Sequence, residues 1–168
     1  MLSRDKAINE KFIHIEKDLN KELIGQEEFL HNLCNYFKEK IKRKKKSTVK
    51  GTLLDQHIVA GLGNIYADEA LFAAKIHPAR RSGSLTRKET ELLLKSAREV
   101  MDKSIDSGGS TMATYVKADG TKGDYLEKFA NVFRCEGKPC PRCGTTLIKT
   151  RIAGRGTHLC PHCQKESK

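Results

Sequence analysis

Four cysteines near the C-terminal end constrain the fold of this chain more than any other feature. Cys140 and Cys143 form one C-x-x-C pair, and Cys160 and Cys163 form a second pair after sixteen intervening residues. Two such pairs supply four soft thiolates, which is the usual ligand set of a tetrahedral structural Zn²⁺ site. We therefore predict one structural zinc ion, bound by these four residues and closing a small β-hairpin.

The residues between the two cysteine pairs have the pattern of that hairpin. Residues 146–152 alternate like a strand, residues 153–156 (Ala-Gly-Arg-Gly) form a turn with two glycines, and residues 157–159 begin the return strand. We expect the turn to present Arg155 outward. The segment 138–168 holds seven Lys or Arg and one Glu, and a purely structural ribbon would not need that charge. An arginine-tipped ribbon suits insertion along a nucleic-acid groove.

The histidines of this segment and the two remaining cysteines are not needed as metal ligands. A complete set of four thiolates leaves no place for His158 or His162, so we interpret both as surface or DNA-facing residues. Cys34 and Cys135 are interpreted as small buried apolar residues or free thiols.

The charge of the whole chain points to a polyanionic partner. The 168 residues contain 32 Lys and Arg against 21 Asp and Glu, for a formal net charge of +11. The sequence has no run of about 18 apolar residues, and its first residues are too polar for a signal peptide. We expect a cytoplasmic, nucleoid-associated protein that binds nucleic acid and no membrane.

Apolar spacing predicts a first amphipathic helix over residues 27–46. Its stripe is formed by large side chains at intervals of three and four, namely Phe29, Leu30, Leu33, Tyr36, Phe37 and Ile41. The run at 38–50 carries eight Lys or Arg and one Glu. It is either the solvated end of a helix or a set of phosphate contacts.

Residues 51–78 have the pattern of two helices joined by a tight turn over Gly61, Leu62, Gly63 and Asn64. Glycines allow positive φ and close approach of a ligand, and a helix beginning at about Asn64 would direct free N–H groups at an anion. Such a turn, including Gly63, could bind phosphate. It could equally be an ordinary helix hairpin in which Asn64 is a cap.

A further helix is predicted after Thr86, which forms a capping box with Glu89 and follows a possible staple residue, Leu85. We expect it to end at Gly108 and Gly109. Its predicted buried stripe is Leu92, Leu93, Ala97, Val100, Met101 and Ile105. Residues 110–135 show no sustained period and are predicted to be a long loop.

Three separated motifs together resemble one known family. They are KKKSTVKGTLLDQHIVAGLGNIYADEALF, GGSTMATYVKADGTKG and CPRCGTTLIKTRIAGRGTHLCPHCQK. In order and spacing they resemble the C-terminal half of bacterial formamidopyrimidine-DNA glycosylases, over about residues 38–165. That family excises oxidised purines, chiefly 8-oxoguanine and formamidopyrimidines, from DNA and then cleaves the abasic strand.

The resemblance implies a mostly α fold, with a helix–two-turn–helix DNA-binding module followed by a zinc ribbon. On this basis residues 1–26 are a poorly defined N-terminal segment. Residues 27–135 are the helical module and residues 136–168 are the ribbon. Residues 110–125 would correspond to the loop that closes over a flipped base.

The resemblance also assigns roles to single residues. Lys46 and Lys50 resemble the lysines that contact phosphate near the lesion, and Asn64 resembles the asparagine that binds phosphate from the two-turn motif. Arg155 resembles the ribbon arginine that grips phosphates beside the abasic site and donates a proton in the second elimination.

Family members begin with Pro-Glu, which supplies an amine nucleophile and a carboxyl group, and carry a β-sandwich catalytic domain. This chain begins Met-Leu-Ser. We therefore expect a truncated family member of base-excision repair that binds damaged duplex DNA without catalysis of its own. The alternative is an active glycosylase and abasic-site lyase, complemented by a separate N-terminal half or using a substitute amine.

Overall fold

A computed structural model describes residues 26–42, 44, 46–107 and 125–166. Within these residues the chain is mostly helical, with one antiparallel hairpin, as the sequence predicts. None of the described helices is long and apolar enough to cross a membrane. The elements, in order, are α2 (Gln26–Lys42), α3 (Val49–Leu53), α4 (Asn64–Ala73), the 3₁₀ turn η1 (Ser82–Ser84), α5 (Arg87–Asp106), α6 (Tyr125–Phe129), β1 (Ile148–Ile152) and β2 (Arg155–Leu159).

Helix α2 confirms the predicted amphipathic element, although it ends at Lys42 and not at Lys46. Phe29, Tyr36, Phe37 and Ile41 are buried, as the stripe requires. The early end has a physical cause. Successive lysines repel one another along a helix, and the chain must turn so that Thr48 can cap the next helix with its side chain.

The glycine turn lies between two helices, but the first of them is only one and a half turns long. Helix α3 ends at Leu53, and residues 54–63 form successive turns before α4 begins at Asn64. Gly61 has a φ of 82°, which an L side chain would rarely adopt. The residue that caps α4 is Gly63, with no side-chain bond, so the prediction of an Asn64 cap is wrong.

Helix α5 begins as predicted, with both hydrogen bonds of the capping box between Thr86 and Glu89. It ends at Asp106, and Gly108 and Gly109 lie outside the described residues. Its buried stripe is partly different from the prediction, because Leu92 and Ile105 are exposed. The stripe instead consists of Leu93, Leu94, Ala97 and Val100, with Met101 at its edge.

The capping box yields a stability prediction. Thr86→Ala removes the acceptor for the Glu89 amide, so we expect a loss of about 1 kcal/mol in stability, or about 2–4 °C in Tm. Thermal unfolding of the zinc-loaded chain measures this. Thr86→Ser keeps the acceptor and should melt near the parent, and an alanine variant that melts with the parent would contradict the assignment.

The hairpin pairs Ile152 with Arg155 and Ile148 with Leu159, so its turn consists of two residues only. Ala153 and Gly154 both have positive φ, at 51° and 73°, as the two-residue turn of a twisted hairpin requires. Arg155 is therefore the first residue of β2 and not part of the turn, which corrects the expected four-residue turn. Residues 110–124 of the predicted long loop lie outside the described residues, and residues 125–129 form α6.

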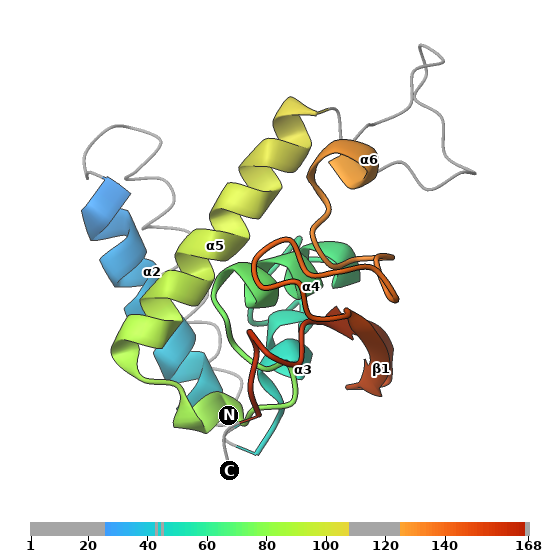
Figure 1. The fold of residues 1–168 in the computed structure, drawn as a ribbon. Coiled ribbons are helices and arrows are strands. Elements are labelled where there is room, and N and C mark those ends of the chain that lie inside the picture. The colour runs from blue at the N-terminus through green and yellow to red at the C-terminus, as the bar shows by residue number, and fades with distance from the viewer. Residues whose placement is uncertain (1–25, 43, 45, 108–124, 167–168) are drawn as a thin grey trace.

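Helix α4 lies at the centre of the molecule, between α5 and the hairpin (Figure 1). One face joins the helical core, where Leu71 packs with Leu93 of α5. The other face carries Phe72 into a second cluster with Val132, Leu147 and two of the predicted metal ligands, Cys140 and Cys160. The helical module and the ribbon therefore share this one helix.

Candidate functional site

The four predicted metal ligands come together. Their sulfur atoms all lie within 4.8 Å of one another, in a group formed by Cys140, Cys143, Cys160 and Cys163. The Sγ atoms of Cys140 and Cys163 are 3.9 Å apart, and those of Cys143 and Cys160 are 3.5 Å apart. A tetrahedral ion with bonds of about 2.3 Å separates its sulfur ligands by about 3.8 Å. The cluster therefore fits one structural zinc ion, with all four ligand positions taken by protein.

The knuckles of the zinc centre are fixed by backbone and side-chain hydrogen bonds. Hydrogen bonds from Thr145 lower the pKa of the Cys143 thiol to about 5, which favours the thiolate that a metal requires. The Arg142 side chain donates to the Phe72 carbonyl and lies over its ring, 4.2 Å from the ring centre. Gln164 donates to the Ile76 carbonyl and accepts from the Cys160 amide. The ribbon is thus attached to the C-terminal end of α4.

Two adjacent acidic residues of α4, Asp68 and Glu69, are fully buried. Glu69 accepts hydrogen bonds from three successive backbone N–H groups, those of Asn131, Val132 and Phe133. Its carboxylate thereby holds the segment that leads into the ribbon, because backbone donors satisfy the buried charge.

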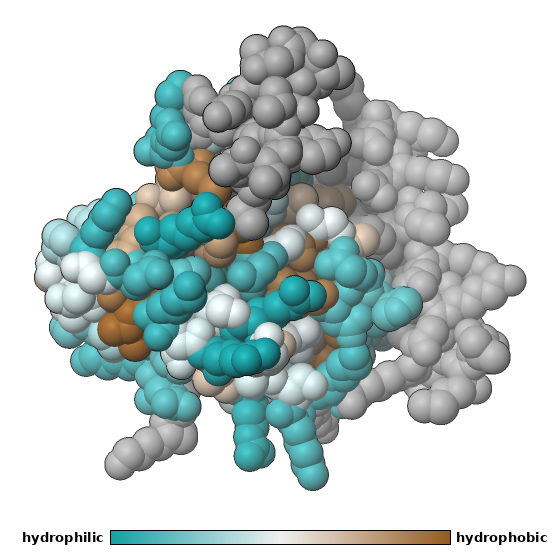
Figure 2. Space-filling model, turned by 90° about the vertical axis from the view of Figure 1, so that its right-hand side faces the viewer, coloured by the Kyte–Doolittle hydropathy of each residue, from teal (hydrophilic) through white to brown (hydrophobic). Residues whose placement is uncertain are grey.

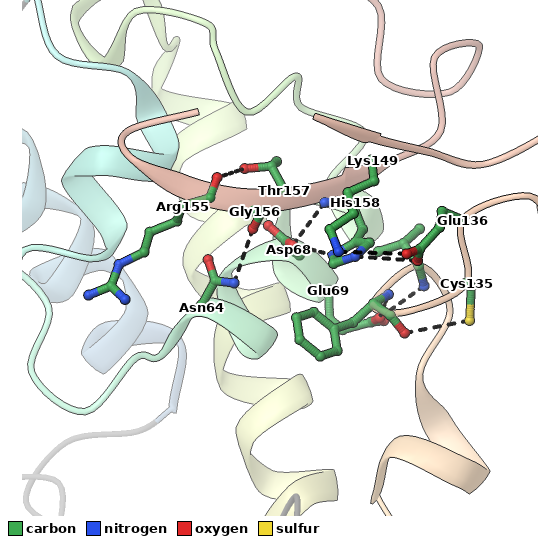
Figure 3. A network of polar contacts seen from close by, with 12 residues as sticks. Asn64, Asp68, Glu69, Cys135, Glu136, Lys149, Arg155, Gly156, Thr157 and His158 are labelled. Carbon is green, nitrogen blue, oxygen red and sulfur yellow. Dashed lines mark hydrogen bonds and ion pairs between the residues drawn. The ribbon is translucent and has the colours of Figure 1, made fainter. Parts of the chain in front are cut away.

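Asp68 holds the hairpin in the same way. Its Oδ1 accepts from the Lys50 ammonium at 2.6 Å, and its Oδ2 accepts from the backbone N–H of His158 at 2.9 Å. The His158 ring nitrogen Nδ1 lies 3.2 Å from Oδ2 (Figure 3). His158 is 3% exposed and packs against the Phe133 ring, so its prediction as a surface or DNA-facing residue is wrong. His162 is exposed, as expected.

Lys50 is enclosed completely. Its Nζ donates to Asp68, to the Gly156 carbonyl at 2.9 Å and to the Thr157 hydroxyl at 2.7 Å. Burial lowers the pKa of Lys50, the Asp68 carboxylate opposes that shift, and the nearby positive charge of Arg155 adds to it. The expected phosphate contact of Lys50 stays a prediction, and the role visible in this conformation is the support of β2.

Asn64 bonds to the residue that follows Arg155, although about 90 residues separate the two in sequence. The side-chain amide of Asn64 donates to the Gly156 carbonyl at 3.1 Å, next to Arg155. An amide group has two hydrogens, and the second has no acceptor among the described residues. The Arg155 side chain is exposed and extends away from His158 in Figure 3. Gly63 and Lys46 are also exposed.

The surroundings of these residues are polar. In Figure 2, the described atoms on the side that carries the hairpin in Figure 1 are mostly hydrophilic, with apolar side chains in small separate patches. At the hairpin itself, Lys149, Arg151 and Arg155 are exposed. Exposed cations beside the Asn64 amide group can bind an anion such as phosphate.

Sequence reasoning does not find Asp68, Glu69 or Gln164. For the two acids a signal exists, because they interrupt the otherwise apolar helix NIYADEALFA, of which six successive residues are buried. A carboxylate in such a helix must find a partner, which points to a buried polar contact. Gln164 follows the last cysteine and has no comparable signal.

Two family models match the chain. The model described as formamidopyrimidine-DNA glycosylase H2TH domain matches residues 24–116, which is more than half of the chain, and the zinc finger found in FPG and IleRS matches residues 137–165. The chain belongs to the formamidopyrimidine-DNA glycosylase family. The family zinc finger spans all four clustered cysteines, so the bound metal is one structural zinc.

Curated members of the family agree with this membership. The formamidopyrimidine-DNA glycosylase of Exiguobacterium sibiricum is 47% identical over 127 residues, which are 76% of this chain and 45% of that protein. That of Oceanobacillus iheyensis is 43% identical over 158 residues, which are 94% of this chain and 54% of that protein. The chain thus spans about half the length of the curated relatives it matches.

Solved structures of the family have the same fold over the shared region. The MutM (Fpg) protein of Thermus thermophilus matches with a TM-score of 0.72 and 42% identity, covering 79% of this chain and 50% of that one. The Lactococcus lactis Fpg in complex with DNA containing an abasic site matches with a TM-score of 0.72 and 43% identity. It covers 79% of this chain and 48% of that chain.

Proposed function

We propose that this chain binds damaged duplex DNA in base-excision repair, at 8-oxoguanine or abasic sites of a bacterial chromosome in the cytoplasm. Binding would use phosphate contacts from the two-turn region and from the zinc ribbon. Family membership supports the proposal, as does the similarity to Lactococcus lactis Fpg solved with abasic-site DNA.

One observation carries the proposal. Asn64 and Arg155, which the family resemblance assigns to phosphate contact, lie on different elements and are joined through Gly156. A single phosphate or two successive phosphates could therefore meet both groups. Contacts of this kind position a protein on DNA without reading its sequence, so we expect little dependence on the bases around the lesion.

We further propose that this chain binds but does not excise bases by itself. Imine formation needs an accessible, uncharged amine. Lys50, the lysine bonded to the strand that carries Arg155, is enclosed and paired with Asp68, which makes it a poor nucleophile. The alternative is an active glycosylase and lyase, in which a separate N-terminal half or a substitute amine supplies the nucleophile and Arg155 assists the second elimination.

Arg155→Ala tests the DNA contact. Because each phosphate contact releases about 0.9 counterions, the slope of log affinity against log salt should become shallower by about 0.9. Fluorescence anisotropy on a duplex with one abasic site, at several salt concentrations, measures this slope. Lys95→Ala removes the same charge from a position beside Leu30 and Glu27 of α2, and should keep the parent slope. Equal slopes for the parent and Arg155→Ala would reject the contact.

Borohydride trapping on the same duplex separates binding from catalysis. Borohydride reduces an imine to a stable amine, so a covalent adduct reports an active nucleophile. We expect the zinc-loaded chain to bind without an adduct. An adduct with strand cleavage would establish the alternative, and Arg155→Ala would then identify whether cleavage depends on that side chain.

A further inference from the structure

All three hydrogens of the Lys50 ammonium have protein acceptors. They point to the Asp68 carboxylate, the Gly156 carbonyl and the Thr157 hydroxyl, at 2.6, 2.9 and 2.7 Å. An ammonium group has three donors and no acceptor. In this conformation Lys50 therefore has no hydrogen to give to a phosphate, and no part of its side chain is exposed.

Two of these acceptors belong to the residues that directly follow Arg155. The Thr157 hydroxyl accepts from Lys50 and donates its own hydrogen to the Arg155 carbonyl at 3.0 Å. The Gly156 carbonyl accepts from Lys50 and also from Asn64. A chain of hydrogen bonds thus runs from Lys50 through the Thr157 hydroxyl to the backbone of Arg155. A separate bond joins Lys50 to Gly156, the residue that Asn64 also holds.

The hairpin needs such support near its turn. Arg155 pairs only with Ile152, the last residue before the two-residue turn, and an isolated two-stranded hairpin is marginally stable. Helix α3 also approaches closely here, since a Cβ added at Gly51 would lie 3.3 Å from the Ala153 Cβ. Lys50, next to Gly51, is therefore well situated to fix the direction in which Arg155 leaves the strand.

We propose that Lys50 is a positioning residue, which holds Gly156 and Thr157 so that Arg155 and Asn64 face the same phosphates, and that it does not contact DNA itself. This inference rests on the proposed function, because it assumes that Arg155 contacts DNA. Asp68 keeps Lys50 in place by neutralising its charge. The Thr157 hydroxyl transmits the constraint to Arg155.

The experiment is a double-mutant cycle in which the slope of log affinity against log salt concentration is measured for each chain. The chains are the parent, Lys50→Met, Arg155→Ala and the double variant, all zinc-loaded and bound to the abasic-site duplex. If Lys50 acts through Arg155, Lys50→Met should show the shallower slope of Arg155→Ala. The double variant should then match Arg155→Ala, with affinities within about twofold. Lys95→Met is the matched control and should retain the parent slope.

Two results would overturn the inference. In the first, each single variant loses about 0.9 from the slope of log affinity against log salt. If these two losses add in the double variant, Lys50 contacts a phosphate directly. If Lys50→Met binds DNA more weakly but keeps the parent slope of log affinity against log salt, the role of Lys50 is merely structural. A smaller folded fraction lowers the amount of DNA bound without changing that slope.

Thr157→Val keeps the test decisive if Lys50→Met fails to fold. This variant leaves the pair of Lys50 and Asp68 intact and removes only the hydroxyl that bonds to Arg155. We expect its slope to shift from the parent value toward that of Arg155→Ala, and an unchanged slope would reject the inference. An Arg155→Ala chain with the parent slope would instead reject the Arg155 contact, and a parent chain that does not bind the abasic-site duplex would reject the proposed function, so these failures are distinguishable.

Discussion

Replacement of Cys163 by serine, or treatment of the parent with a strong chelator, is expected to unfold the ribbon over residues 136–166. In structural zinc sites the free energy of metal binding is folding free energy, of about 10–16 kcal/mol at neutral pH. That range matches or exceeds the whole stability of a typical domain, about 5–15 kcal/mol. Loss of the ribbon also removes the hydrogen bonds of Thr157 to Lys50 and of His158 to Asp68, so DNA binding should fall as well.

Circular dichroism melts with and without chelator, together with zinc stoichiometry, measure this effect. Cys135→Ser is the matched control, because Cys135 packs beside the cluster without belonging to it. It should bind one zinc ion and melt near the parent. Identical melting of the parent with and without chelator would reject a folding role for the metal.

The second large effect is expected for Asp68→Asn, which removes the buried charge and hardly changes the side-chain volume. The Lys50 ammonium would remain enclosed without a carboxylate, and removal of one partner of a buried ion pair costs about 3–5 kcal/mol. Urea unfolding of the zinc-loaded chain measures the loss. Lys50→Met combined with Asp68→Asn removes both charges, keeps an acceptor for the His158 backbone N–H and should regain much of the loss.

Glu99→Gln is the control for this comparison. It breaks the pair of Lys95 and Glu99, which lies on the exposed face of α5 with more than half of each side chain accessible. Exposed pairs of this spacing contribute about 0.3–0.5 kcal/mol. If Asp68→Asn were no more costly than Glu99→Gln, the network at the hairpin would not be a source of stability.

The features that follow local rules can be predicted from the sequence. The spacing of the four cysteines indicates the zinc centre, and the Thr86 capping box locates the start of α5. The stripe of α5 is harder to predict because Leu92, Leu93 and Leu94 are consecutive. A helix with three consecutive leucines could bury either the first two or the last two. Packing of α5 against α2 and α4 decides that Leu92 is the exposed one.

The polar network could not be predicted, because its partners are remote in sequence. Lys50 and Thr157 are separated by 107 residues, and Asp68 and His158 by 90. Lysine and aspartate are ordinarily surface residues, so nothing local distinguishes Lys50 from the exposed lysines before it. For the same reason the sequence alone favours an exposed His158, whereas its strand is covered by α4 and by the segment that carries Phe133.

Helix α4 and the residues that directly follow it anchor the ribbon at several points, through Asp68 to β2, through Glu69 to residues 131–133, and through Phe72 and Ile76 to the zinc knuckles. Relative rotation of the two parts would break these bonds together. The backbone of the surface that we propose for DNA is therefore held in place before any encounter, and association costs mainly the ordering of exposed side chains such as Arg155. Binding then depends mainly on how the protein is oriented as it meets the DNA, and its positive charge, +11 in total, can attract the DNA from a distance.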